Sequence, residues 1–375
     1  MTASINLAGG GTGGHVYPLV AVAEALRHLA PELKIVFVGT ERGIETRVVP
    51  ERGFELELVK VLPIRGFGVS GAVRGAVCAV GSLPASRALI ERLNPCAVLT
   101  VGGYAAGPVS LMARWARRPV GLLEPNAVMG LANRLMAPLV QRAYTAFEPA
   151  ERFFQPSKVL RSGVPIRNGF SPQPYVLTAR PRRVLVLGGS QGARTLNEQL
   201  PLAFAKQSIP LEVRHQCGRN DVELVRARYT SAGVSAVEVI SFIDDMPTAI
   251  AWADLVISRS GASAVSEICA VGRPSLLVPF PYAAGQHQQV NAETLASVGA
   301  ASWIHNAEVT AERMAKEVAL LLGDESKLVR MAIAAREFGR PNAARAIAVD
   351  LLKLGKERLP QRLLDGVTAQ LKESV

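Results

Sequence analysis

A strand followed by a glycine turn and a helix recurs along this 375-residue chain, and this unit constrains the fold more than any other feature. Near the amino terminus, an apolar run at residues 4–8 leads into GGGTGGH at 9–15. After a segment at 168–182 that holds three prolines and little periodicity, the run at 183–187 leads into GGSQGA at 188–193. The repetition predicts an α/β protein built from two similar halves of comparable size.

The first glycine turn has two interpretations. We expect a helix to begin at Pro18, so that backbone N–H groups and the positive end of a helix dipole can bind an anion. The turn also satisfies the G-x-G-x-x-G pattern of dinucleotide-binding folds, which needs an acidic residue about 20 positions further on. The second predicted strand, at 34–38, runs into Gly-Thr instead, so the required acid is not clearly in place. This weakens the dinucleotide interpretation, and a NAD-dependent dehydrogenase is kept as an alternative.

A histidine closes this turn. Lone histidines are usually structural or solvated, but His15 would be held at the carboxyl end of a strand, where α/β sheets bind ligands. Its position favours a role in acid–base chemistry.

Residues 258–291 carry groups suited to an anion, a diol and a sugar. The apolar run at 254–258, the small residues SGAS and a short apolar-periodic segment predict a strand, a turn and a helix that Gly272 ends. The first amides of this helix suit a phosphate or diphosphate, and Glu267, about one turn further in, suits a ribose diol. Neutral donors and acceptors at 286–291 suit sugar hydroxyls. The window indicates a nucleotide-sugar site, and a glycine-punctuated α/β unit with a solvated loop is the alternative.

The charge of the chain calls for an acidic partner. The formal charge of +11 fits nucleic acid, anionic lipid or phosphorylated small molecules. Aromatic residues make up 5% and are not interleaved with basic ones, which disfavours a nucleic-acid platform. The four cysteines, Cys78, Cys96, Cys217 and Cys269, form no CxxC pair, so we expect no disulfide framework, no zinc site and a reducing cytoplasm. We also expect no signal peptide and no membrane-spanning helix, so membrane contact would be peripheral.

Apolar residues and arginines share the segment between residues 62 and 92. Arg65, Arg74 and Arg87 are spaced through a stretch rich in glycine, valine and alanine. An apolar surface rimmed by arginines fits the headgroup region of an anionic leaflet. A core helix is the other interpretation.

Further motifs lie next to predicted strands. GGYAAGP at 102–108 is a second glycine turn, in which Tyr104 either packs in the loop or offers its hydroxyl to a substrate. LEPN at 123–126 ends the following strand, and RSGVPIR at 161–167 precedes the proline-containing segment. The two acids of FIDDM at 242–246 would point to opposite faces of an extended segment, so we expect a solvated turn there and no Mg²⁺ site.

The turn GGTGGHVYP, the motifs GGYAAGP and GGSQGA and the window at 258–291 together resemble, in this order, the MurG family of bacterial cell-wall glycosyltransferases. The resemblance extends to residue 354. It implies the GT-B fold, in which two Rossmann-like domains face each other across a cleft. It also implies an inverting transfer of N-acetylglucosamine from UDP-N-acetylglucosamine to the C4 hydroxyl of undecaprenyl-diphosphoryl-N-acetylmuramoyl-pentapeptide (lipid I). The product, lipid II, serves peptidoglycan synthesis. No cofactor or metal is required, because a helix terminus can hold the leaving diphosphate.

The resemblance also implies roles for individual residues. It associates the first glycine turn with the acceptor diphosphate and the reaction centre. The proton would be handled by His15, with Glu124 and Asn126 as alternatives, and Tyr104 would face the acceptor. Ser190 would either bind a phosphate or cap the next helix. The residues implied in donor binding are Thr12, Gly13, Gly14, Asn126, Arg167, Ser190, Ile243, Ala262, Ser263, Ala264, Val265, Ser266, Glu267, Gln288 and Asn291.

Within this donor set, each part of the nucleotide sugar has its own residues. The helix that starts near Ala262 and the third glycine turn would hold the diphosphate, and Glu267 would hold the ribose. The backbone of Ile243 would contact the base, and Gln288 and Asn291 the sugar hydroxyls.

The chain departs from the family at two of these motifs. The family usually reads HEQN where this chain has LEPN, so the histidine and the glutamine are missing while Glu124 and Asn126 remain. Val164 replaces the asparagine of a GNPVR-like turn, and Arg167 is the residue carried over.

We expect an acceptor- and membrane-binding domain at residues 1–166 plus 341–375, which would include a closing helix at 342–354, and a donor-binding domain at 167–340. Surface helices are expected at 311–322 and 325–337, and a loosely ordered amphipathic tail after residue 355.

The resemblance places the protein at the cytoplasmic face of the inner membrane as a peripheral protein, with roles in cell shape and cell division. The implied partners are lipid I, the anionic membrane surface and other proteins of cell-wall synthesis or division. A non-catalytic binding protein and a nucleotide-sugar epimerase remain alternatives.

Overall fold

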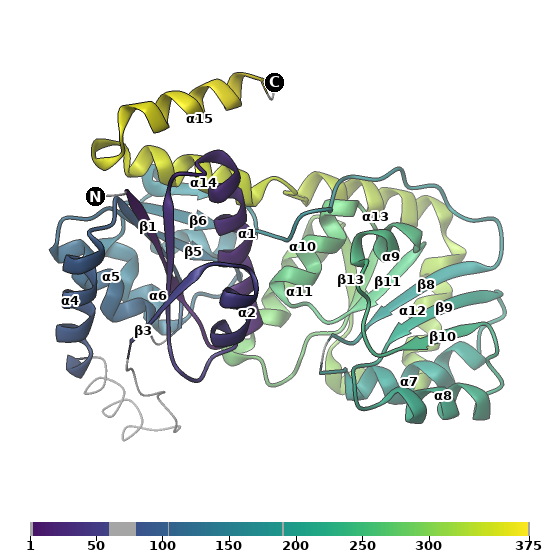
Figure 1. The fold of residues 1–375 in the computed structure, drawn as a ribbon. Coiled ribbons are helices and arrows are strands. Elements are labelled where there is room, and N and C mark those ends of the chain that lie inside the picture. The colour runs from purple at the N-terminus through teal and green to yellow at the C-terminus, as the bar shows by residue number, and fades with distance from the viewer. Residues whose placement is uncertain (1–2, 60–79, 104, 190, 374–375) are drawn as a thin grey trace. The chain divides into compact units, whose positions relative to one another are not determined.

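The computed structural model describes residues 3–59, 80–103, 105–189 and 191–373, with side chains as far as Thr368. The chain divides into two compact units: unit 1 is Met1–Asn168 with Asn342–Val375, and unit 2 is Gly169–Pro341 (Figure 1). Each unit is a parallel sheet with helices on both faces, which confirms the expected pair of Rossmann-like domains. None of the helices in the described ranges has the length and apolar character needed to span a bilayer.

The described residues of unit 1 contain seven parallel strands, arranged β3-β2-β1-β4-β5-β6-β7. In chain order the strands are β1 (Ser4–Gly9), β2 (Lys34–Gly39), β3 (Glu55–Leu58), β4 (Ala97–Gly102), β5 (Val120–Glu124), β6 (Arg142–Thr145) and β7 (Val159–Arg161). The main helices are α1 (Gly13–Leu29), α2 (Glu45–Glu51), α4 (Leu83–Leu93), α5 (Ala106–Trp115), α6 (Leu131–Met136), α14 (Ala343–Leu354) and α15 (Gln361–Glu373). The strand order reverses between β1 and β4, which is the position where open α/β sheets bind ligands.

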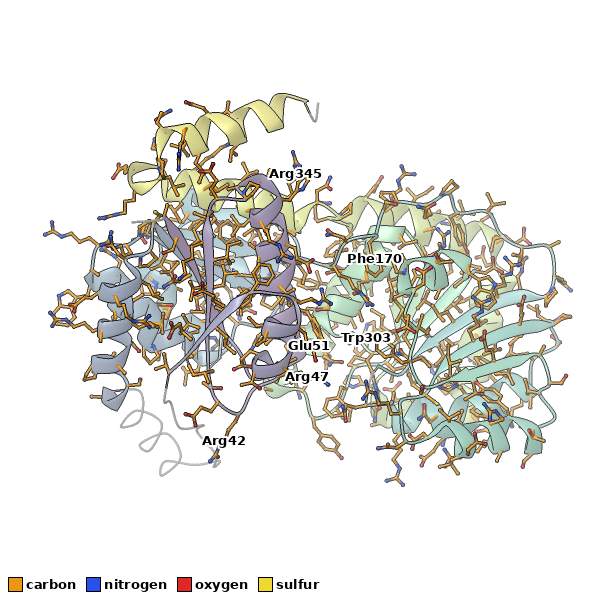
Figure 2. All side chains as sticks on the ribbon, in the orientation of Figure 1. Arg42, Arg47, Glu51, Phe170, Trp303 and Arg345 are labelled. Atoms are coloured by element: carbon orange, nitrogen blue, oxygen red, sulfur yellow. The ribbon has the colours of Figure 1, made fainter. Side chains whose placement is uncertain are left out.

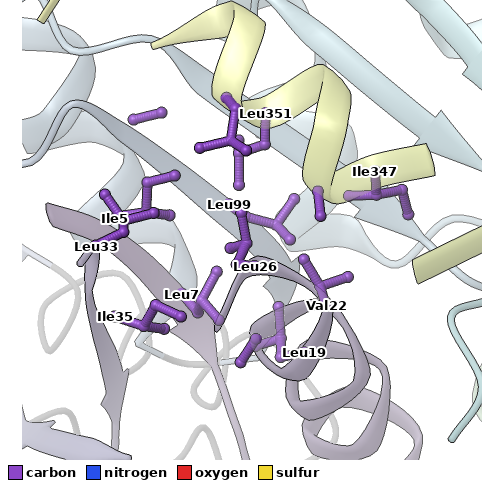
Figure 3. Close-up of a cluster of buried hydrophobic side chains, with 14 of the residues drawn as sticks. Ile5, Leu7, Leu19, Val22, Leu26, Leu33, Ile35, Leu99, Ile347 and Leu351 are labelled. Atoms are coloured by element: carbon purple, nitrogen blue, oxygen red, sulfur yellow. The ribbon is translucent and has the colours of Figure 1, made fainter. Parts of the chain in front are cut away.

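Side chains of β1 alternate between two apolar layers, as a strand buried on both faces requires. Ile5 and Leu7 pack with α1 and α14, including Leu26 and Leu351 (Figure 3). Ala8 points to the other face, into a layer that α4, α5 and α6 complete. Helices therefore cover both faces of the sheet, and the turns that follow the strands lie at the carboxyl ends of the strands.

Unit 2 repeats the plan with six parallel strands in the described residues, arranged β10-β9-β8-β11-β12-β13. The strands are β8 (Arg182–Leu187), β9 (Leu211–Gln216), β10 (Val237–Ile240), β11 (Leu255–Ser258), β12 (Ser275–Leu277) and β13 (Ala301–Trp303). The helices are α7 (Arg194–Ala205), α8 (Val222–Ser231), α9 (Met246–Trp252), α10 (Ala262–Val271), α11 (His287–Ser297), α12 (Ala311–Gly323) and α13 (Glu325–Phe338). Here the order reverses between β8 and β11, so unit 2 has the topology of unit 1.

Most of the predicted elements of unit 2 are confirmed. Gly272 ends α10 with φ of 80°, in the left-handed region that favours glycine. The two expected surface helices are α12 and α13, with bounds within one residue of the prediction. The proline-containing segment is packed on unit 2 through Asp254, whose carboxylate accepts hydrogen bonds from the backbone N–H groups of Thr178 at 3.1 Å and Arg183 at 2.8 Å.

Two local predictions are wrong. Helix α1 begins at Gly13, and Pro18 lies inside it, because Thr12 already has the extended conformation of a residue that precedes a helix. The segment after residue 355 is not a loose tail over its described length: it contains α15. Leu363 and Val367 of α15 are buried in the same apolar layer as α1 and α14, and this tertiary contact could not be read from local sequence.

Helix α14 packs on α1 and β4 of unit 1. Asp350 of α14 holds it to the sheet, since its carboxylate accepts hydrogen bonds from the Arg142 guanidinium at 2.8 and 3.1 Å and from the Tyr144 hydroxyl at 3.0 Å. Burial, with this carboxylate beside the phenol, raises the pKa of Tyr144 well above its usual value, so it stays a donor.

Asp350→Asn should destabilise unit 1 by about 1–3 kcal/mol, because the carboxamide places an NH2 group against a donor and leaves a buried polar group unpaired. The measurement is hydrogen exchange in peptides of β6 and α14 as a function of urea. Glu357→Gln makes the same chemical change at an exposed carboxylate and should change the free energy of unfolding little. Equal effects of the two variants would contradict an anchoring role for Asp350.

Candidate active site

The first glycine turn connects β1 to α1. The carbonyl of Thr12, an exposed residue, accepts hydrogen bonds from the backbone N–H groups of His15 and Val16, both at 3.1 Å. Gly13 and Gly14 are the first residues of α1, so their N–H groups have no partner within the helix and lie at the positive end of its dipole. The turn has the geometry of an anion-binding site, and the ligand contacts of Thr12, Gly13 and Gly14 stay predictions.

His15 is half-buried, and its Nδ1 lies 3.3 Å from the carbonyl oxygen of Gly10. A carbonyl can only accept a hydrogen bond, so this contact favours the tautomer in which Nδ1 carries the proton. The lone pair is then on Nε2, the nitrogen that can take a proton from a substrate hydroxyl. This tautomer is the one that a general base needs.

The second glycine turn meets the first at the carboxyl edge of the sheet. Gly103 has φ of 91°, and a Cβ atom there would lie 2.9 Å from the carbonyl oxygen of Gly10. Only glycine permits both this conformation and this approach. Tyr104, which follows, lies outside the described residues.

Glu124 ends β5 and is buried. Its carboxylate accepts hydrogen bonds from Asn133 Nδ2 at 2.8 Å and from the backbone N–H of Asn126 at 3.1 Å. Burial raises the pKa of Glu124 from 4.5 to about 7, although these two donors favour the charged form. Asn133 also approaches the second glycine turn: a Cβ on Gly102 would lie 3.0 Å from its Oδ1. Glu124 thus fixes the amide side chain that lies against this turn.

Asn126 and Arg167 lie at two further loops of unit 1. Asn126 is half-buried just after β5, where its backbone is held by Glu124. Arg167 is exposed and follows Val164 and Ile166, which are both buried and fix the loop beneath it. The donor contacts of both residues stay predictions.

In unit 2, the third glycine turn connects β8 to α7. Gly192 has φ of 76°, and a Cβ atom there would lie 2.4 Å from the carbonyl oxygen of Cys217. Asn197 donates hydrogen bonds from Nδ2 to this carbonyl oxygen at 2.9 Å and to Asp221 Oδ2 at 2.8 Å. The turn is therefore held against the end of β9. Ser190 lies outside the described residues.

Behind this turn, His215 is fully buried and has a structural role. Its Nε2 contacts Asn197 Oδ1 at 3.1 Å, and its Nδ1 contacts the Tyr229 hydroxyl at 2.9 Å. Burial lowers the pKa of His215 to about 3, so the ring stays neutral. It orders the side chain of Asn197 and through it the third turn.

Helix α10 begins after Gly261 with the small residues predicted to admit a diphosphate. Ser263, Ala264, Ser266 and Glu267 are half-buried, and Ala262 is buried. The Val265 side chain is fully buried, and its backbone N–H donates to the carbonyl of Gly261 at 3.0 Å, so it faces the core of unit 2. The amides of the first turn are the groups that this helix offers to an anion.

Gln288 and Asn291 come from α11 and lie against the start of α10. Gln288 Oε1 accepts a hydrogen bond from the backbone N–H of Phe280 at 3.0 Å, which leaves its Nε2 3.8 Å from the position of a Cβ on Gly261. Asn291 is fully buried and donates from Nδ2 to the carbonyl of Ser260 at 3.1 Å. Gln288 Nε2 lies near this helix terminus and Asn291 orders the turn that precedes it, and the sugar contacts of both residues stay predictions.

Ile243 is buried beyond the end of β10, and the two acids that follow it are exposed. Asp245 caps α9 by accepting a hydrogen bond from the backbone N–H of Thr248 at 3.2 Å. Among the residues that the structure describes, no three His, Cys, Asp or Glu side chains gather to hold a metal ion.

Sequence reasoning missed the side chains that hold the turns in place: Asn133, Asn197, Arg259 and Glu45, whose carboxylate accepts a hydrogen bond from the backbone N–H of Gly11 at 2.8 Å. Arg259 Nη1 donates to Asn306 Oδ1 at 2.7 Å and to the carbonyls of Val278 and Pro279, and burial lowers its pKa to about 10. The partners of these side chains lie far away in the sequence, as Glu45 lies 34 residues from Gly11, so no local pattern could have identified them.

Comparisons with known proteins cover both units. The Glycosyltransferase family 28 N-terminal domain matches residues 5–145, and the family's C-terminal domain matches residues 183–347. Two curated relatives carry the name UDP-N-acetylglucosamine–N-acetylmuramyl-(pentapeptide) pyrophosphoryl-undecaprenol N-acetylglucosamine transferase. The relative from Sorangium cellulosum (strain So ce56) is 49% identical over 94% of this chain and 89% of its own length. The relative from Anaeromyxobacter sp. (strain K) is 42% identical over 94% of this chain and 93% of its own length.

A solved structure agrees. The crystal structure of Acinetobacter baumannii MurG matches with a TM-score of 0.79 and 30% identity, and the match covers 94% of this chain and 99% of that one. The chain therefore belongs to glycosyltransferase family 28 and, within it, to the MurG family.

Proposed function

We propose that the protein transfers N-acetylglucosamine from UDP-N-acetylglucosamine to undecaprenyl-diphosphoryl-N-acetylmuramoyl-pentapeptide. The observation that carries this proposal is the 49% identity, over 94% of the chain, with a relative named for that activity. The two anion-binding edges described above support it, because both substrates carry a diphosphate.

The chemical step is a displacement with inversion. The C4 hydroxyl oxygen of the muramoyl sugar forms a bond to the anomeric carbon, while the bond from that carbon to the β-phosphate oxygen of UDP breaks. The bonding electrons leave with UDP, and the hydroxyl proton passes to a base on the protein. Such a step needs a basic group at the hydroxyl and a positive field at the diphosphate.

We assign donor binding to unit 2. The N-terminus of α10 stabilises the charge that develops on the diphosphate, and Gln288 Nε2 beside it donates to a sugar hydroxyl. Glu267, one turn further along the exposed side, accepts hydrogen bonds from the ribose diol. The backbone at Ile243 contacts the base. The donor contacts that the resemblance implies for Asn126 and Arg167 of unit 1 stay predictions of their own.

His15 is the general base in this scheme. Its Nδ1 lies against a carbonyl, which favours the tautomer with the lone pair on Nε2, and it follows the first glycine turn directly. Both carboxylate oxygens of Glu124 accept hydrogen bonds from groups of unit 1. We therefore infer that Glu124 positions Asn126 and Asn133 and does not contact the reacting hydroxyl.

We also propose that unit 1 binds the membrane surface peripherally. Leu111 and Trp115 lie one turn apart on α5, and Leu131 and Leu135 one turn apart on α6, all exposed, and the two helices are neighbours. Arg87 of α4 lies 5.2 Å above the Trp115 ring, and Arg114 and Arg134 are exposed. Apolar side chains rimmed by arginines suit an anionic leaflet, at the cytoplasmic face where the donor is available. The sequence predicted this role for the segment between residues 62 and 92, and of its three arginines Arg65 and Arg74 lie outside the described residues.

The proposed activity is tested by release of UDP from UDP-N-acetylglucosamine, with and without a soluble analogue of the lipid-linked muramoyl-pentapeptide. Acceptor-dependent release with a disaccharide product is expected. Release without acceptor would favour an epimerase or a hydrolase, and no release would favour a binding protein.

His15→Ala should lower kcat by roughly 10²–10⁴-fold, the usual contribution of a general base, with little change in the affinity for UDP. Steady-state kinetics and calorimetric titration of UDP measure the two quantities. The control is His28→Ala, since His28 is an exposed histidine of the same helix. Equal loss of turnover and UDP affinity would remove His15 as the base.

Glu124→Gln should flatten the pH dependence of stability in unit 1. Because the folded pKa of about 7 lies above the ordinary 4.5, the carboxyl contributes stability that is complete below pH 4.5 and is lost as pH rises to 7. The permanently neutral variant should therefore gain roughly 3 kcal/mol relative to the original protein over this range, as measured by urea unfolding at each pH. Parallel pH profiles of the two proteins would contradict the raised pKa, and a loss of turnover as large as in His15→Ala would make Glu124 the base.

Leu131→Ser with Leu135→Ser should weaken binding to vesicles that contain anionic lipid by at least tenfold, because each buried leucine contributes about 1.5–3 kcal/mol. Sedimentation with vesicles measures the affinity, and added salt should weaken it further through the arginines. The control is Leu320→Ser, at a similarly exposed leucine of α12 in unit 2. Equal loss in the control would argue against a surface specific to α5 and α6.

A further inference from the structure

Glu45 is a buried carboxylate to which the proposed reaction assigns no part. It is the first residue of α2, the residue is 1% exposed, and no ion pair involves it among the described residues. Oε1 accepts hydrogen bonds from the backbone N–H and the hydroxyl of Thr40, at 2.9 and 3.1 Å, and Oε2 accepts one from the backbone N–H of Gly11 at 2.8 Å. The carboxylate therefore connects the turn after β2 to the first glycine turn.

Three glycines make room for this carboxylate. A Cβ atom on Gly10, Gly39 or Gly43 would lie 2.1, 2.6 or 1.8 Å from a side-chain atom of Glu45. Such contacts are too short for real atoms. The Glu45 side chain can therefore lie where it does only because these three residues have no side chain. Glycines near the first turn thus leave space for the Glu45 carboxylate, as well as exposing the amides that suit an anion.

The peptide group between Gly10 and Gly11 connects Glu45 to His15. Its N–H, on Gly11, donates to Glu45 Oε2, and its carbonyl, on Gly10, accepts from His15 Nδ1. Because a peptide group is planar, fixing the N–H also fixes the direction of the C=O. A carboxylate on the N–H also polarises the group and strengthens the carbonyl as an acceptor.

We propose that Glu45 is a positioning residue that holds His15 in the Nδ1-protonated tautomer through the Gly10–Gly11 peptide group. The carboxylate acts on the ring nitrogen that does not meet the substrate, so Nε2 keeps its lone pair for the reacting hydroxyl. Glu45 also takes the N–H of Gly11 and so leaves the amides of Gly13 and Gly14 to the ligand. The inference rests on the proposed function in that His15 is the base, although the tautomer can be measured without turnover.

Glu45→Gln tests the carboxylate. Two donors, both from Thr40, meet Oε1, so the carboxamide oxygen should occupy that position and its NH2 should face the N–H of Gly11. The peptide group should then turn away, and His15 should lose its fixed carbonyl. We expect kcat to fall about 10²-fold, as for other small displacements of catalytic groups, while UDP affinity stays unchanged.

The direct readout is nitrogen NMR of histidine-labelled protein, which distinguishes the two neutral tautomers of His15. The original protein should show the Nδ1-protonated form, and Glu45→Gln should show a mixture. A second variant, Gly43→Ala, keeps Glu45 but places a methyl group against its Oε2, so it should reproduce both effects. The control is Glu51→Gln, at the exposed carboxylate that ends the same helix (Figure 2).

Each result has a consequence. A changed tautomer with reduced kcat in both variants supports the inference. An unchanged tautomer overturns it, whether or not kcat falls, because Glu45 would then only stabilise the fold. If the original protein shows no acceptor-dependent turnover but the tautomer still changes in both variants, the proposed function fails and the positioning role stands.

Discussion

Parallel strands bring every following turn to the same edge of a sheet, and in both units helices begin at this edge with backbone amides that suit an anion. The turns approach neighbouring main chain closely, as Gly103 approaches Gly10 and Gly192 approaches the carbonyl of Cys217. A side chain at either glycine would separate two neighbouring turns and misdirect their N–H groups. Close packing of main chain therefore comes first, and the chemistry of the site depends on it.

Where the turns pack closely, main-chain N–H and C=O groups are shielded from water. At each turn, polar side chains form hydrogen bonds with these groups. Glu45 serves the first turn, Glu124 with Asn133 the second, and Asn197 with Asp221 the third. All three sets accept from or donate to main chain near a turn, which offsets the cost of their own burial. These hydrogen bonds fix the main chain at each turn, in addition to the apolar layers on the faces of the sheets.

The sequence was sufficient for features whose cause is local. Apolar runs of five or six residues, each followed by glycines, predicted the strands and turns that precede α1, α7 and α10. A buried strand appears in the sequence as an apolar run, and a turn with a left-handed conformation appears as a glycine. The hydrogen bonds behind the turns left no such trace. Glu45 is 34 residues from Gly11, and Asn133 is 32 residues from the carbonyl of Val101 that it meets. The order of strands brings these partners together, and no spacing in the sequence encodes it.

The same reasoning accounts for the two letters by which LEPN departs from the family's usual HEQN. Leu123 is fully buried in the apolar layer formed with α1 and α14, and Pro125 is buried as well, so neither position presents a side chain to a ligand in unit 1. Strand β5 alternates, and Glu124 between them points to the face where Asn133 meets it. Leucine and proline satisfy the packing at positions 123 and 125. The chain keeps the other two residues of the motif, Glu124 and Asn126, which form the hydrogen bond at the end of the strand.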